Sequence, residues 1–199
     1  KWGYAAMAAP LGLKLVDLNL PAPQPGFARL AVNGTPLVYA DFWVNAVLTE
    51  IDVFISVAKM KCHTTTGVTL AMKNLFGLAP TSEYRHSPED NNRSAFHESP
   101  IFDTRVPKVI LDLNRARPID LAIIDGIFTA EAGAGPWDVD MAQIKPGLLV
   151  AGRNPVAVDA VATALMGFDP TTTTGTIPFI GSENHIALAN QMGLGPHRL

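Results

Sequence analysis

The stretch DVFISVAKMKCHTTTGVTLAMKNLFG, residues 52–77, decides how we interpret the rest of the chain. It begins with an apolar run at 52–58, which is typical of a buried strand. Three threonines follow, and we expect Thr66 to be the N-cap of a helix over 67–76 that Gly77 ends. A buried strand that leads through a loop into a helix is where open α/β sheets place their binding sites.

The end of this strand carries alternating cationic and titratable groups. In extended geometry Lys59, Lys61 and His63 share one face, where two ammonium groups and an imidazole suit a carboxylate or phosphate. A helix N-terminus at the loop would add backbone N–H donors, and the helix could bring Lys73 to the same anion. An unperturbed imidazole titrates near neutral pH, which suits a general acid or base. We therefore expect catalytic roles for His63 and Lys61 and substrate binding by Lys59, Lys73, Asn74 and Thr66. The alternative is a solvated strand end whose lysines face only water.

The remaining pattern predicts an α/β fold with a mainly parallel sheet, helices on both faces and a small β-hairpin near the N-terminus. Further buried strands are expected at 120–125 and 147–151, because both runs are short and apolar. An apolar stripe predicts a helix at 101–115, and Asn154-Pro155 begins another through 166.

The N-terminal part is expected to alternate between short helices and strands. Helices are expected at 2–9 and 41–48, a strand at 13–18, and a hairpin with an Asn33-Gly34 turn at 29–39. A last helix is expected at 183–192. The polar stretch 78–99 is long for a loop and is expected to be a lid, a binding loop or disordered. It carries Arg85, His86, Arg93 and His97.

Three carboxylates could meet at the same sheet edge if the strands are neighbours. Asp125 ends one strand, Glu131 follows in a glycine-rich loop, and Asp159 lies early in the helix after Pro155. Such a set suits a hard divalent ion such as Mg²⁺. The alternative is structural, because Asp-Gly is a common turn and an early-helix aspartate is favoured by the helix dipole.

Composition limits the classes of protein and partner. The 199 residues suit a single domain with a net charge of −3 and 17% charged residues, which gives no general case for nucleic acid binding. No apolar stretch reaches the ~20 residues that span a bilayer. The single cysteine, Cys62, excludes a four-cysteine iron–sulfur cluster held by this chain alone.

Since the sequence starts at Lys1, we expect a fragment that lacks an N-terminal region and any signal within it. The compartment and the oligomeric state therefore stay open.

Three motifs resemble one family. KMKCHTTTGVTLAMKNLFG (59–77), LAIIDGIFTAEAGAGP (121–136) and GRNPVAVDAVATALMGFDP (152–170) are similar to the domain-of-unknown-function family DUF362, with its K-x-K-x-H run before T-x-x-x-K-N-x-x-G. The resemblance covers about residues 50–199, with a fainter match before that, and supports the stretch 59–77, with its lysines and His63, as part of a site. Because the family has no established reaction, the resemblance implies a site more than a function.

The sequence therefore leaves two functional hypotheses and the alternative of a purely structural domain. The first is an enzyme that acts on a small anionic substrate, with or without a divalent metal. The alternative is a redox-accessory or ligand-binding module, because the resemblance implies partners: family members often carry a ferredoxin-like iron–sulfur segment that this chain lacks.

Overall fold

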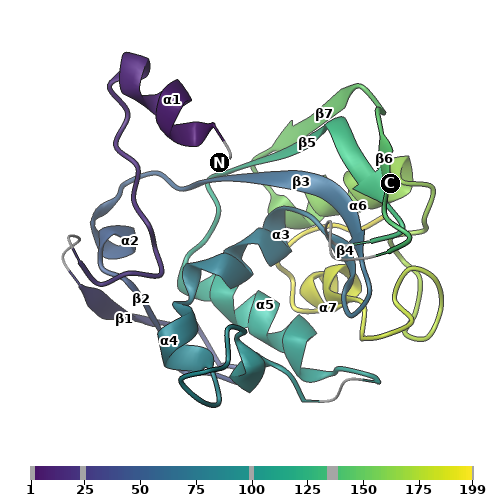
Figure 1. Cartoon of the computed structure of the whole chain (residues 1–199). Helices are drawn as coiled ribbons and strands as arrows, with labels where there is room; N and C mark the ends of the chain where they lie inside the picture. Colours follow the sequence, from purple (N-terminus) through teal and green to yellow (C-terminus); the bar gives the residue numbers. More distant parts are fainter. Residues whose placement is uncertain (1–2, 23–25, 99–100, 134–138, 199) are drawn as a thin grey trace.

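The structure is a computed structural model that describes residues 3–22, 26–98, 101–133 and 139–198 (Figure 1). Its main sheet consists of β3 (Ile55–His63), β4 (Gly67–Thr69), β5 (Leu121–Glu131), β6 (Ala142–Ile144) and β7 (Leu148–Gly152). A separate antiparallel pair is formed by β1 (Phe27–Ala31) and β2 (Asp41–Asn45). The α-helices are α1 (Tyr4–Ala8), α2 (Val47–Glu50), α3 (Ala71–Asn74), α4 (Thr81–Tyr84), α5 (Arg105–Ala116), α6 (Pro155–Leu165) and α7 (His185–Gln191). Short 3₁₀ turns lie at η1 (Ala9–Leu11), η2 (Leu75–Leu78) and η3 (Ser94–Phe96).

The sheet is mixed, which confirms the α/β class but differs from the expected mainly parallel arrangement. Strands β3 and β5 run parallel, while β4 pairs antiparallel with β3, and β6 and β7 pair antiparallel with β5. The reason is connection length, because parallel neighbours need a long crossover. The segment from α3 to α5 supplies one between β3 and β5, whereas β5 is followed by β6 and β7 with no described helix between them.

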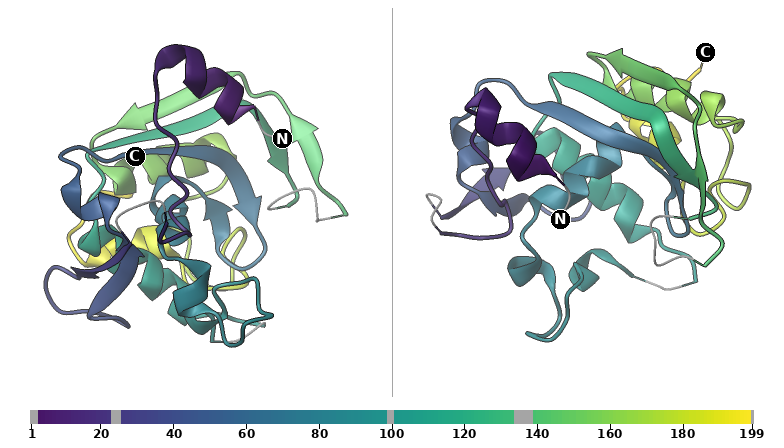
Figure 2. Two further views of the ribbon diagram at one scale, coloured as in Figure 1. Left: turned by 60° about the vertical axis from the view of Figure 1, so that its left-hand side comes forward. Right: turned by 45° about the horizontal axis from the view of Figure 1, so that its top comes forward.

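Four helices that pack against this sheet or one another lie on one side of it, whereas helices on both faces were expected. Figures 1 and 2 show α3, α5, α6 and α7 on the same side. On the opposite side Ile55 and Val57 of β3 are 47% and 62% exposed, and Leu149 of β7 is 59% exposed. A one-sided covering is normal for antiparallel pairs, which explains the difference.

Helices α5 and α6 confirm the sequence-based expectations. Val106, Val109, Ile110 and Leu113 form the buried face of α5, as the apolar stripe predicts. Helix α6 begins at Pro155, and the side chain of Asn154 caps it by accepting a hydrogen bond from the N–H of Ala157. Both helices thus follow from local signals.

The expected helix at 67–76 is wrong at both ends, because α3 spans only Ala71–Asn74 and Gly77, which was expected to end the helix, lies inside η2. Residues 67–69 form β4, which turns back against the end of β3 so that Cys62 pairs with Val68. Gly67 has φ of 73°, a conformation that glycine adopts without strain and that lets the chain reverse after three threonines. Thr66 consequently caps no helix, and its hydroxyl donates to the carbonyl of Val68. The strand itself is also longer than expected, because it continues through the lysines to His63.

Two further expectations in the N-terminal part are wrong. Residues 13–18 form no strand and are mostly exposed, since no neighbouring strand pairs with them. Asp41 does not cap a helix but pairs with Ala31 in the hairpin, because cross-strand pairing outweighs the local capping signal. The predicted helix at 2–9 is confirmed over its described part as α1 and η1, with Pro10 in the first turn of η1. The last helix is confirmed as α7.

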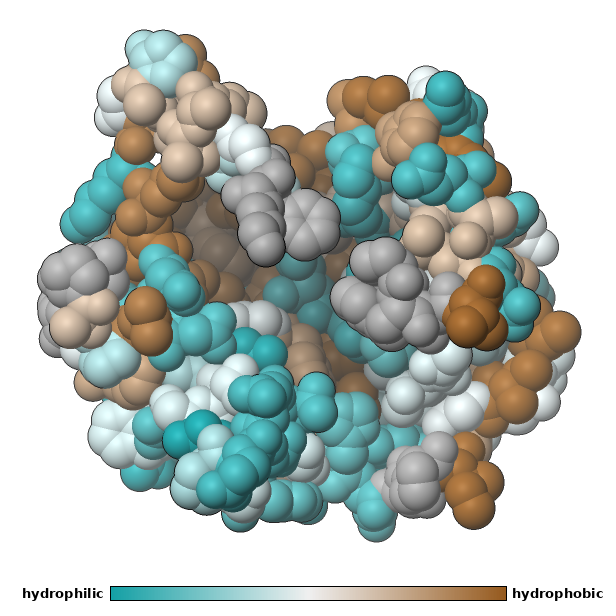
Figure 3. Space-filling view, in the orientation of Figure 1, coloured by the Kyte–Doolittle hydropathy of each residue, from teal (hydrophilic) through white to brown (hydrophobic). Residues whose placement is uncertain are grey.

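The segment between α3 and α5 contains short helices and buried aromatic rings. Tyr84 of α4 and Phe96 of η3 are 6% and 0% exposed, and their ring centroids lie 4.5 Å apart. The ring of Phe76 packs edge-on against Phe96 at 5.0 Å. The polar remainder of the segment contributes to the hydrophilic lower left part of the face in Figure 3, which is hollowed near its centre. No described helix is long and apolar enough to cross a membrane.

Candidate functional site

A polar cavity of about 340 Å³ lies where the end of β3 meets α3 and the segment that precedes α5. The turn after β3 and the short α3 bring together parts of the 52–77 stretch, and residues 91–97 complete the wall. The cavity is lined by His63, Thr66, Lys73, Phe76, Asn91, Asn92, Arg93, His97 and Val106. Of the expected site residues, the cavity brings together His63, Thr66 and Lys73.

Lys73 is the largely buried cation of this cavity. Burial, followed by the positive charges of Lys61 and Arg93, lowers the pKa of its ammonium group from 10.5 to about 8. Its nitrogen lies 5.1 Å from the ring centroid of Phe76, a cation–π contact. Among the described residues Lys73 has no carboxylate partner. The cavity therefore contains a positive charge that the described side chains do not neutralise.

Arg93 adds a second cation, from outside the motif. Its guanidinium donates to the carbonyls of Ala79 and Gly77 and to the side-chain oxygen of Asn19, which are all neutral acceptors. Burial lowers the pKa of Arg93, which remains charged because a guanidinium deprotonates only at very high pH. The sequence places Arg93 in a polar loop 20 residues after Lys73, and only its residue type could have marked it as a candidate.

The imidazole of His63 is oriented by the turn that follows it. Its Nδ1 accepts the backbone N–H of Thr65 at 3.1 Å and of Thr66 at 3.3 Å. An Nδ1 atom that accepts hydrogen bonds carries no proton, so the proton of the neutral ring lies on Nε2. Thr65 and Thr66 therefore fix the tautomer of His63, which residue spacing alone could not show.

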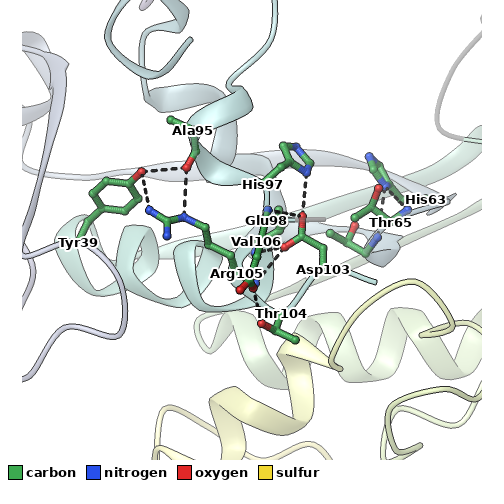
Figure 4. A network of polar contacts seen from close by, with 11 residues as sticks. Tyr39, His63, Thr65, Ala95, His97, Glu98, Asp103, Thr104, Arg105 and Val106 are labelled. Atoms are coloured by element: carbon green, nitrogen blue, oxygen red, sulfur yellow. Dashed lines mark hydrogen bonds and ion pairs between the residues drawn. The ribbon is translucent and has the colours of Figure 1, made fainter. Parts of the chain in front are cut away.

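His97 and Asp103 form a hydrogen-bonded pair at the edge of the cavity (Figure 4). The His97 Nδ1 atom lies 3.0 Å from Asp103 Oδ2, and the Asp103 side chain is fully buried. Asp103 also accepts the backbone N–H groups of Arg105 and Val106 at 2.9 Å, at the start of α5. Arg105 in turn donates to the carbonyl of Ala95, so α5 holds the segment that carries His97 in place.

Lys59 lies outside this cavity, on the exposed side of β3. Its ammonium group donates to Asp125 Oδ2 at 2.6 Å and to the carbonyl of Phe128 at 2.7 Å. The hydrogen bond from Lys59 lowers the pKa of Asp125. Lys59 and Asp125 are partners across the parallel pair of β3 and β5. An expected substrate-binding residue is therefore bound to an expected metal ligand.

The other two carboxylates are also apart. Glu131 is exposed at the end of β5, while Asp159 is fully buried in α6 and accepts the backbone N–H groups of Ala71 and Met72 at 2.8 and 3.0 Å. Burial raises the pKa of Asp159 to about 7, against the lowering effect of these two hydrogen bonds. Asp159 thus caps α3, and the described residues contain no group of three metal-ligating side chains.

Asn74 supports the strand rather than the cavity. Its amide donates to the hydroxyl of Ser56 at 3.1 Å and to the carbonyl of Val57 at 3.4 Å. These contacts tie α3 to β3 immediately beside Lys73. We infer that the adjacent lysine and asparagine of the motif have different tasks, one facing the cavity and the other fixing the helix.

Comparisons with known proteins point to the same family as the resemblance. A family model described as "Domain of unknown function (DUF362)" matches residues 1–164. A protein of Synechocystis sp. (strain ATCC 27184 / PCC 6803 / Kazusa), named thylakoid-associated protein sll1697, is 30% identical over 141 residues. The match covers 70% of this chain and 39% of that protein, so the chain spans about two-fifths of its relative. No solved structure matches the chain significantly.

Proposed function

The chain belongs to the DUF362 family, and from that premise we propose that its cavity between β3, α3 and residues 91–97 binds a small carboxylate or phosphate as the substrate of an enzyme. The observation that carries this proposal is the pair of cations, Lys73 and Arg93, for which the described residues supply no carboxylate. Holding two uncompensated charges in a partly buried hollow is costly, and a bound anion removes that cost.

The chemistry of the cavity suits a small oxyanion. A guanidinium and an ammonium group provide directional donors for carboxylate or phosphate oxygens, and Asn91 and Asn92 line the same space. A volume of about 340 Å³ fits a small metabolite better than a polymer. Lys61 strengthens the positive potential, because its charge acts on Lys73.

Binding should be measured by isothermal titration with inorganic phosphate and with acetate, each against a chloride background. We expect at least one of the two oxyanions to bind and Arg93→Gln to weaken binding at least tenfold, since a charged hydrogen bond contributes about 1.5–3 kcal/mol. The matched control is Arg198→Gln, which removes an exposed arginine that does not line the cavity. If neither oxyanion binds the unmodified chain, or if Arg93→Gln binds as well as the control, the proposal is wrong.

A further inference from the structure

The hydrogen bonds of the two cavity histidines give their rings opposite tautomers. Asp103 is buried and accepts backbone N–H groups, so its carboxylate has the role of acceptor, and the proton between it and His97 belongs to the histidine Nδ1. The Nε2 atom of neutral His97 then carries the lone pair. With its side chain 41% exposed, His97 can accept a proton from a molecule in the cavity that it lines.

His63 has the reverse arrangement and is unsuited to the same task. Its Nδ1 accepts the N–H groups of Thr65 and Thr66, which places the proton of the neutral ring on Nε2. A ring of this tautomer has a donor rather than a lone pair at Nε2. Of the two histidines, His97 is therefore the one whose hydrogen bonds leave Nε2 able to accept a proton.

We propose that His97 is the catalytic base of this cavity and removes a proton from a small anion that carries an acidic C–H bond beside a carbonyl group. The proposal rests on the proposed function, because the anion must first bind beside Lys73 and Arg93. Asp103 is then the positioning residue that fixes the tautomer of His97 and stabilises the imidazolium that forms.

The step balances without any other reagent. The C–H bond breaks, its proton moves to His97 Nε2, and its electron pair becomes the C=C bond of an enolate whose charge lies on the former carbonyl oxygen. The positive charges of Lys73 and Arg93 stabilise that oxygen, because fixed charges in a partly buried cavity act most strongly on charge that develops during the reaction. Return of the proton to the same carbon regenerates neutral His97 and completes an exchange.

The test is hydrogen–deuterium exchange at carbon, followed by NMR of the small molecule in D₂O. The probes are pyruvate and dihydroxyacetone phosphate, which share the activated C–H bond and differ in the anionic group. We expect the chain to accelerate exchange of at least one probe, and the responding probe identifies a carboxylate or a phosphate substrate. His97→Asn should slow that exchange about 10²–10⁴-fold, since this is the usual contribution of a general base.

The variants separate the role of a base from that of structure. Asparagine at position 97 can still donate to Asp103, so we expect His97→Asn to bind phosphate like the unmodified chain. His86→Asn is the matched control, since His86 is exposed and does not line the cavity, and it should exchange at the unmodified rate. Asp103→Asn should shift the ¹⁵N NMR signals of His97 away from the Nδ1–H tautomer, a change that a purely structural role would not produce.

Each outcome decides a different statement. An anion that binds while neither probe exchanges, or exchange that survives His97→Asn, overturns His97 as the base and leaves the anion site standing. Failure of every oxyanion and both probes to bind overturns the proposed function itself. Exchange lost in His97→Asn with binding intact supports the proposal.

Discussion

Replacing Lys73 by methionine should make the protein more stable near neutral pH while abolishing its response to anions. Methionine is a comparably long, unbranched side chain, so the space beside Phe76 stays filled. The pKa of Lys73 falls from 10.5 to about 8, which corresponds to about 3 kcal/mol of free energy spent on charging a largely buried ammonium group. Lys73→Met removes this cost, and we expect the free energy of unfolding at about pH 7 to rise by about 2 kcal/mol after small packing losses.

The pH dependence distinguishes this explanation from a general packing effect. Because the pKa is lower in the folded state, the unfolded chain binds more protons between about pH 8 and 10.5, and stability rises with pH across that window. The cost of the charge is complete below about pH 8 and disappears above 10.5. The advantage of Lys73→Met should therefore shrink towards zero as the pH approaches 10.5.

Urea denaturation at several pH values, with and without phosphate, measures both effects. Phosphate stabilises the unmodified chain by mass action, by about 2.7 kcal/mol when its concentration is 100 times its dissociation constant, and Lys73→Met should not respond. The control is Lys14→Met, which alters an exposed lysine and should change neither quantity. Destabilisation of Lys73→Met by more than about 1 kcal/mol near pH 7, or an undiminished phosphate effect, would refute the reasoning.

Three further predictions concern the scaffold around the cavity. Asp112→Ala should lower the free energy of unfolding by about 3 kcal/mol in urea denaturation, because this buried carboxylate accepts the backbone N–H groups of residues 37–39; a loss below 1 kcal/mol would contradict it. Gly67→Ala should cost about 2 kcal/mol or more in the same assay, since φ is 73° and an added Cβ would lie 2.7 Å from the Phe179 ring, whereas Gly77→Ala, with no atom within 4 Å, should be nearly neutral. Burial lowers the pKa of His185 to about 3, so between about pH 6.5 and 3 the unfolded chain takes up a proton that the folded chain does not, and stability falls as the pH falls. His185→Leu should therefore gain about 3 kcal/mol relative to the unmodified chain between pH 7 and 4, and equal losses in the two proteins would disprove this.

The elements predicted correctly are those with a strong local signal. The apolar stripe of α5 and the Asn154-Pro155 start of α6 depend on residues three or four apart, and the structure confirms both. The class of fold and the family are confirmed as well. The helix expected at 67–76 failed because the chain reverses at Gly67, where pairing with β3 outweighs the helical pattern.

The residues of the site also fall into two groups, those that the sequence indicated and those that only the tertiary structure brought together. Residue type and spacing alone pointed to His63, Thr66 and Lys73, because they belong to one continuous stretch of polar and cationic residues. Only the tertiary structure placed Arg93 and His97 opposite them, paired Lys59 with Asp125 and buried Asp159 beneath α3. The physical reason is range: capping, turn and periodicity signals act over a few residues, whereas the meeting of side chains far apart in the chain depends on strand register and packing of the whole core.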